Sequence, residues 1–158
     1  MLIGIMSDSH DNLPAIASAV RFFNDEKVSS VLHAGDLVAP FTYQEFKKLI
    51  MPIQMIFGNN DGEKLGLKKT FGEKIHISPY NLKIGGKKVV LMHEPDNLAA
   101  ISKSGYFDLI IYGHTHEVDI RDEESLIVNP GECGGWVSGK STVAIWDTDS
   151  NEVDVVEV

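Results

Sequence analysis

Histidine, aspartate and asparagine side chains recur in this chain directly after short apolar segments. Two of them, His114 and His116, follow the apolar run 109–111. Side chains alternate in direction along an extended segment, so we expect both imidazoles to point to the same side. Two imidazoles at one strand exit could supply half of a metal site. The pair taken alone is equally compatible with surface histidines or with packed core histidines.

The other apolar segments end in the same residue types, which favours the metal site. Residues 2–6, 31–34, 53–57 and 87–92 each run into an aspartate, an asparagine or a histidine. Seven donors are too many for one tetrahedral zinc ion but suit two metals that share a carboxylate. Imidazole and carboxylate without thiolate indicate first-row ions such as Mn, Fe, Zn, Co or Ni. The predicted metal ligands are Asp8, His10, Asp36, Asn59, His93, His114 and His116.

The elements that must position these side chains follow from apolar periodicity. The first half predicts strands at 2–6, 31–34 and 53–57 with helices between them, one of which starts at Pro40 and buries Phe41 and Ile50. The second half predicts hairpins at 82–92, 118–128 and 142–156, with a tight turn at 129–131. Parallel strands followed by hairpins predict an α/β fold with two mixed sheets packed face to face and helices outside.

Composition limits the class of protein and of partner. The 158 residues suit a single domain, 1–158, with a core that needs no disulfide. A net charge of −9 argues against nucleic acid and anionic membrane surfaces as partners. One cysteine, Cys133, and no apolar leader or membrane span lead us to expect a cytoplasmic protein. The sequence leaves open whether the chain is a monomer or a homo-oligomer.

Five motifs in fixed order resemble those of the calcineurin-like metallophosphoesterases, in particular the small single-domain phosphodiesterase branch. The motifs are Asp8-Ser9-His10, Gly35-Asp36, Gly58-Asn59-Asn60-Asp61, His93 and Gly113-His114-Thr115-His116, and they span nearly the whole chain. The resemblance implies a four-layer αββα sandwich over two divalent metal ions. We favour manganese, with nickel, iron, cobalt or zinc as alternatives.

The resemblance also assigns roles to these residues. One ion would be held by Asp8, His10, Asp36 and His116, and the other by Asp36, Asn59, His93 and His114. A hydroxide that bridges the two ions would attack the phosphorus of a small phosphate ester. Asp36, Asn59, His93, Asn60 and Asp61 are therefore the predicted catalytic group, in which Asp61 is expected to orient its neighbours.

The chain departs from the family pattern in two places. Many members carry a histidine at the position of Asn60, and asparagine cannot supply a proton to a leaving group. Glu94 and Pro95 replace the glycine and second histidine that usually follow His93. Glu94 could be a surface residue, a partner of a metal ligand, or a charge that disfavours highly anionic monoesters.

Several other residues allow more than one interpretation. We expect His33 to be a core or near-site histidine and His76 to be solvated. The loop 131–136 could line the mouth of the site, or it could be a glycine-rich turn with Trp136 packed.

The predicted function is a metal-dependent phosphodiesterase, and two alternatives share the fold. The retromer subunit of this family has lost part of its metal set and serves as a protein-binding scaffold. Larger DNA-repair nucleases carry nucleic-acid-binding segments that a chain of 158 residues cannot contain. The complete ligand set favours the enzyme over the scaffold.

Overall fold

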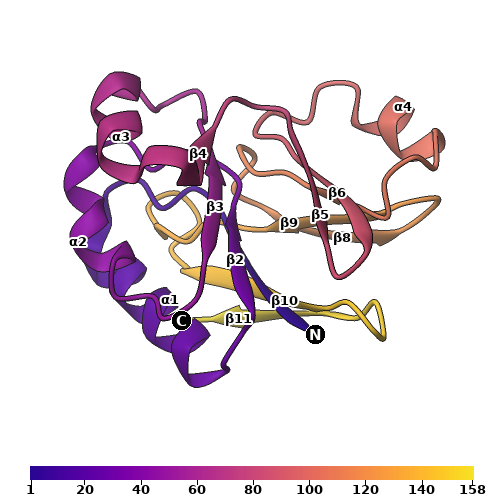
Figure 1. Ribbon diagram of the computed structural model, residues 1–158, viewed down its shortest axis with the longest axis horizontal. Helices are drawn as coiled ribbons and strands as arrows, with labels where there is room; N and C mark the ends of the chain where they lie inside the picture. The colour runs from indigo at the N-terminus through magenta and orange to yellow at the C-terminus, as the bar shows by residue number, and fades with distance from the viewer.

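The computed structural model describes residues 1–158, which form two mixed sheets with helices on their outer faces (Figure 1). The six-stranded sheet has the order β11-β10-β1-β2-β3-β4, in which β1 to β4 are parallel and β10 runs antiparallel to both β1 and β11. Its strands are β1 (Leu2–Met6), β2 (Ser30–His33), β3 (Ile53–Ile56), β4 (Ile75–His76), β10 (Thr142–Asp147) and β11 (Val153–Glu157).

The five-stranded sheet has the order β5-β6-β7-β9-β8. Its central pairs β6–β7 and β7–β9 are parallel, whereas the edge strands β5 and β8 pair antiparallel. Its strands are β5 (Tyr80–Ile84), β6 (Lys87–Leu91), β7 (Leu109–Ile111), β8 (Val118–Asp122) and β9 (Leu126–Pro130). Both sheets are therefore mixed, as predicted.

Helices cover the outer face of each sheet. The six-stranded sheet carries α1 (Leu13–Asp25), α2 (Tyr43–Phe46) and α3 (Lys64–Phe71), together with two 3₁₀ turns at Pro40–Thr42 and Gly72–Lys74. The five-stranded sheet carries α4 (Leu98–Lys103). The α1 helix begins as predicted, because the Asn12 side chain accepts a hydrogen bond from the Ala15 N–H and a proline occupies the first turn. No helix of the chain has the length and apolar character to cross a membrane.

Three separate apolar cores hold the four layers together. Ile3 and Ile5 of β1 face the other sheet, whereas Met6 faces the helices, so alternate residues of one strand enter different cores. The core between the sheets also contains Leu109 and Ile111 of β7. A third, smaller core lies between the five-stranded sheet and α4. This burial on both faces explains why the central strands are continuously apolar in sequence, and the predicted αββα sandwich is confirmed.

Three local predictions are wrong. Helix α2 ends at Phe46, so Ile50 lies beyond it and is 77% exposed, while Phe41 belongs to the 3₁₀ turn and is 52% exposed. The predicted turn at 129–131 is instead the end of β9, because Asn129 and Pro130 continue the pairing with β8. An apolar pattern does not show where such a short helix ends.

Trp146 lies between the sheets with its side chain fully buried, and its indole N–H donates to Asn151 Oδ1 at 3.2 Å. We predict that Trp146→Ala lowers the free energy of unfolding by about 3–5 kcal/mol, because it leaves a cavity in the central core. Denaturant unfolding measures the loss. The matched control is Trp136→Ala, at the 66%-exposed tryptophan, which should change stability by less than about 1 kcal/mol. Equal losses in the two variants would contradict this packing.

Cys133 is fully buried, and burial raises the pKa of its thiol to about 12. A thiol that stays protonated and covered does not attack disulfide reagents. We predict no reaction with a colorimetric disulfide reagent in the native protein and reaction of one thiol per chain after unfolding. Native-state reaction at the rate of free cysteine would show that the 131–136 loop opens.

Candidate metal centre

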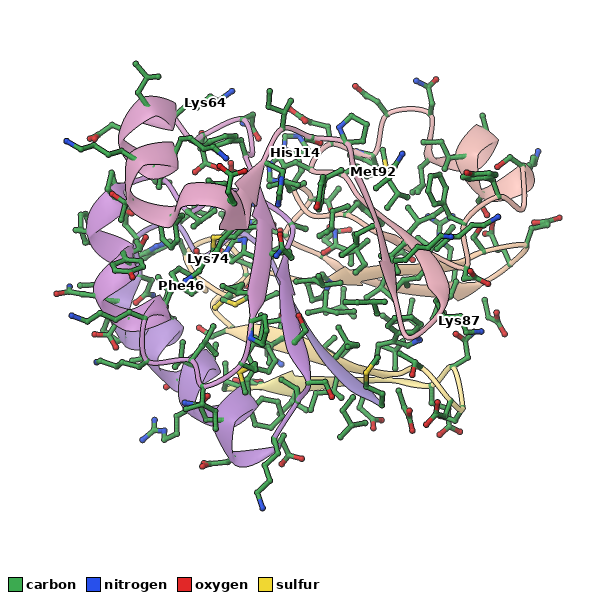
Figure 2. The ribbon with its side chains drawn as sticks, viewed as in Figure 1. Phe46, Lys64, Lys74, Lys87, Met92 and His114 are labelled. Carbon is green, nitrogen blue, oxygen red and sulfur yellow. The ribbon has the colours of Figure 1, made fainter.

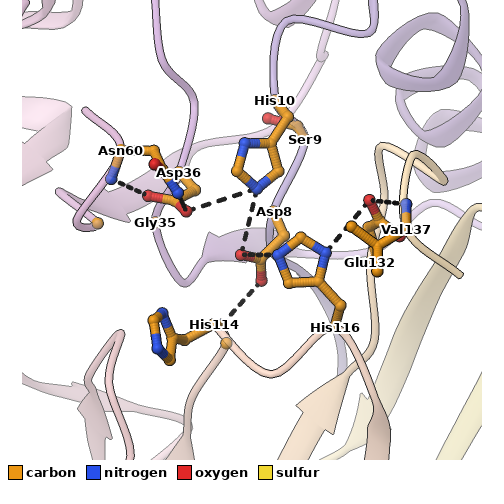
Figure 3. A network of polar contacts seen from close by, with 12 residues as sticks. Asp8, Ser9, His10, Gly35, Asp36, Asn60, His114, His116, Glu132 and Val137 are labelled. Carbon is orange, nitrogen blue, oxygen red and sulfur yellow. Dashed lines mark hydrogen bonds and ion pairs between the residues drawn. The ribbon is translucent and has the colours of Figure 1, made fainter. Parts of the chain in front are cut away.

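The carboxyl ends of five strands from both sheets bring the predicted ligands together. Figure 3 shows Asp8, His10, Asp36, His114 and His116 among them. From the six-stranded sheet, Asp8 follows β1, Asp36 follows β2 and Asn59 follows β3. From the five-stranded sheet, His93 follows β6, and His114 and His116 follow β7. The site therefore lies where two sets of parallel strand ends meet, as expected for α/β folds.

On one side of the site, two imidazoles surround two buried carboxylates. His10 Nε2 lies 3.7 Å from Asp8 Oδ1 and 3.4 Å from Asp36 Oδ2, and His116 Nε2 lies 3.5 Å from Asp8 Oδ1. Asp8 Oδ1 and His10 Nε2 are buried and have no hydrogen-bond partner. Buried polar atoms left without partners are rare and indicate an additional group. Donor atoms from Asp8, His10 and His116 lie within 4.8 Å of one another, a spacing that fits a cation.

On the other side, Asn59 joins two further imidazoles. Its Oδ1 lies 2.8 Å from His93 Nε2 and 2.9 Å from His114 Nδ1. His93 Nε2 also lies 3.3 Å from Asp36 Oδ2, and its Nδ1 lies 2.8 Å from the Ala34 carbonyl oxygen, to which it donates. This backbone contact turns Nε2 towards the site.

The charge on Asp36 controls the state of His93. Burial alone would lower the pKa of His93, but the Asp36 carboxylate outweighs it and raises that pKa to about 9. Burial would raise the pKa of Asp36, but hydrogen bonds from His93 and Asn60 hold it well below its usual range. The carboxylate is thus ionised, and His93 carries a proton that a divalent ion would replace.

Asn60 and Asp61 hold Asp36 through different groups: Asn60 contacts its carboxylate, and Asp61 contacts its backbone N–H. The Asn60 backbone N–H donates to Asp36 Oδ1 at 2.8 Å, and its side-chain amide donates to Oδ2 at 2.7 Å. Asp61 accepts hydrogen bonds from the backbone N–H groups of Asp36, Gly58 and Val38 at 2.6–3.1 Å. Asp61 therefore ties the loops after β2 and β3 together, and its partners are backbone amides rather than an imidazole.

The sequence did not predict the role of Glu132. It follows β9, is buried, and places Oε1 3.2 Å from His116 Nδ1. It also accepts hydrogen bonds from the backbone N–H groups of Trp136, Val137 and Ser138. Burial alone would raise the pKa of Glu132, but these hydrogen bonds lower it. Its place at the end of a strand, like that of the other site residues, was the available signal.

Residues beside the ligands resolve two of the open interpretations. The loop 131–136 lines the site: Trp136 is exposed, and its indole N–H donates to the His10 carbonyl oxygen at 3.0 Å. His33 is a buried structural histidine that accepts from the Gly35 N–H and contacts Ser9 Oγ at 3.0 Å. Burial lowers the pKa of His33 to about 4, so it is neutral.

The prediction that side chains alternate along an extended segment, so that His114 and His116 point to the same side, is wrong. Asp8, His10, Asp36, His114 and His116 all have positive φ, between 39° and 70°, so none of these loops is extended. As a result His114 faces Asn59, whereas His116 faces Asp8 on the other side. Non-glycine residues in this conformation are strained and concentrate at functional sites.

Two glycines allow the loops to approach this closely. A Cβ on Gly58 would overlap Asp36 Oδ1, and a Cβ on Gly113 would overlap Ser7 Oγ and come within 2.7 Å of Asp8 Oδ2. Gly58 and Gly113 precede ligand positions in the sequence motifs. The close packing of carboxylates against backbone therefore accounts for these glycines.

Comparisons with known proteins agree with this architecture. A family model described as the calcineurin-like phosphoesterase superfamily domain matches residues 1–151. A phosphodiesterase of Methanocaldococcus jannaschii is 42% identical over 159 residues, which cover 96% of each chain. A solved archaeal phosphodiesterase superposes on all of both chains with a TM-score of 0.93 at 40% identity.

A more distant structure extends the comparison to the fold alone. A Vps29 variant from Entamoeba histolytica covers 100% of this chain and 99% of its own, with a TM-score of 0.72 at 20% identity. The family match over nearly the whole length and the 42% identical relative are decisive. The chain belongs to the calcineurin-like phosphoesterase superfamily.

Proposed function

We propose that this phosphoesterase is a phosphodiesterase that works with two divalent metal ions. The observation that carries the proposal is the position of Asp36 Oδ2, which lies 3.4 Å from His10 Nε2 on one side and 3.3 Å from His93 Nε2 on the other. A carboxylate oxygen that lies between two sets of imidazoles is well placed to be shared by two ions. The 42% identical relative is itself a phosphodiesterase.

The two ions would have different sets of ligands. One would be held by Asp8, His10, Asp36 and His116, and the other by Asp36, Asn59, His93 and His114. Both sets combine imidazole nitrogens with carboxylate or amide oxygens, which suits manganese first, and nickel, iron, cobalt or zinc as alternatives. The unpartnered Asp8 Oδ1 and His10 Nε2 support the first set.

When bound, the two ions would lower the pKa of a water molecule that acts as the nucleophile and would neutralise the phosphoryl oxygens. The chain's own residues would fix the geometry around them. Asp61 and Glu132 hold Asp36 and His116 in place, and Asn60 can donate a hydrogen bond but no proton. Esters with stable leaving groups are therefore the expected substrates, and no protein nucleophile is needed.

The proposal also covers the domain organisation, the cellular location and the substrate of the enzyme. Residues 1–158 would act as one domain in the cytoplasm, where a single free cysteine is usual. A small phosphate ester is the expected substrate, because a net charge of −9 disfavours nucleic acid. A scaffold without turnover, the alternative for this fold, would not need all seven ligands in place.

We predict that the metal-stripped protein does not hydrolyse bis-p-nitrophenyl phosphate and that adding manganese restores the activity. Asp36→Asn should lower turnover by about 10²–10³-fold, because it removes the charge that both ions share. Release of nitrophenolate, which needs no acid to leave, gives the rate for the diester and for p-nitrophenyl phosphate. A folded, metal-loaded protein that is silent with both esters and every metal would favour the scaffold.

We also predict that Asp61→Asn lowers activity and manganese affinity by about 10- to 100-fold, a typical effect of residues that orient metal ligands. The new amide would place an N–H donor against the backbone N–H groups that the carboxylate now accepts. Titration with manganese and diester turnover measure the two effects. Asp122→Asn, at an exposed hairpin residue, is the matched control and should behave as wild type. Unchanged manganese affinity in Asp61→Asn would contradict the orienting role.

A further inference from the structure

A cavity of about 750 Å³ opens beside the metal centre, a size that accommodates organic ligands. Its walls come from the end of β3, from α3 and from the segment that leads from β4 to β5. Asn59 lines this cavity and also contacts His93 and His114. A phosphate held at the metal centre would therefore have one of its ester groups at the mouth of the cavity.

The walls of the cavity are aromatic and apolar. His76 and Tyr80 stack in parallel, with ring centroids 3.7 Å apart and an interplanar angle of 4°. Phe57 adds a third ring to the lining. Leu65 and Ile77, also in the lining, are 89% and 80% exposed. Stacked rings with exposed aliphatic side chains beside them form a surface suited to a flat aromatic ligand.

His76 was expected to be solvated, but the structure places it in the wall of the cavity. It is half-buried, and its Nε2 lies 2.6 Å from Gln54 Oε1. Burial, with Lys68 nearby, lowers the pKa of His76, which favours an uncharged ring. This partner and the Tyr80 stack hold the imidazole in one orientation before any ligand arrives.

One cation in the cavity wall is free to meet a ligand. Lys64 forms no ion pair, and its Nζ lies 5.9 Å from the centroid of the Phe57 ring. Lys68, in contrast, donates to the Ile75 carbonyl oxygen and pairs with Glu73. Figure 2 shows Lys64 and His114 towards the same edge of the molecule. An ammonium group there could donate to the polar edge of a ring bound in the cavity.

We propose that this cavity binds the nucleoside arm of the substrate, with the base against the His76–Tyr80 pair while the phosphate lies at the metal centre. The inference rests on the proposed phosphodiesterase function and narrows its substrate class to esters that carry a nucleobase. Stacking of a base on aromatic side chains recognises the ring and tolerates different bases. Glu94, one of the positions at which the sequence departs from the family pattern, also lines this cavity.

The test compares two inhibitors of diester turnover by the manganese-loaded protein. Adenosine monophosphate and the matched sugar phosphate, which lacks the base, carry the same phosphate and differ only in the ring. We expect the nucleotide to inhibit about tenfold more tightly, the effect of one stacked base. The ratio of the two inhibition constants does not depend on the fraction of folded protein.

Variants locate the preference in the cavity. His76→Ala should bring the ratio close to one, and so should the double change Leu65→Ala with Ile77→Ala, which removes exposed side chains and spares the core. Ile50→Ala, equally exposed but outside the cavity lining, is the matched control and should keep the wild-type ratio. Equal inhibition by both compounds, or a preference that survives in all cavity variants, would overturn the proposal.

The experiments distinguish an error in the proposed function from an error in the proposed nucleoside-binding cavity. If the protein hydrolyses no diester, the proposed function fails, and calorimetric titration of the manganese-loaded protein with the same two compounds tests the cavity independently. A nucleotide preference in that titration supports the cavity, and its absence overturns it.

Discussion

The structure of the site depends on one buried carboxylate, that of Asp36, which is held between two imidazoles. Its Oδ2 lies within 3.4 Å of both His10 Nε2 and His93 Nε2. The negative charge of this buried carboxylate is costly unless positive charge lies beside it. Protons on the imidazoles or metal ions can supply that charge. The surrounding loops serve to keep this oxygen in place.

The two sheets supply the rigidity that the site requires. Five of the predicted ligand residues adopt left-handed backbone conformations, and Asp8 Oδ1 and His10 Nε2 are buried without partners, so these loops are locally strained. The core between the sheets fixes β1, β2 and β7 directly before the ligands. Packing far from the chemistry thus stabilises a geometry that the loops alone would not adopt.

The sequence was sufficient for the parts of the structure that depend on pattern. Continuous apolar runs identified the central strands. The polar residues after them predicted seven ligands, and the structure brings these seven side chains together, since strand ends of parallel sheets converge. It was insufficient where tertiary contacts decide the conformation. The left-handed backbone at His114 and His116, the extension of β9 through Pro130 and the contact between Glu132 and His116 all depend on neighbours that are distant in sequence.

The most direct test of the central claim is anomalous diffraction at the manganese edge from crystals grown with manganese. Two manganese peaks per chain are expected on opposite sides of the Asp36 carboxylate, one beside His10 and one beside His93. A single peak, or two peaks that do not share Asp36, would contradict the claim that this carboxylate joins two metal ions.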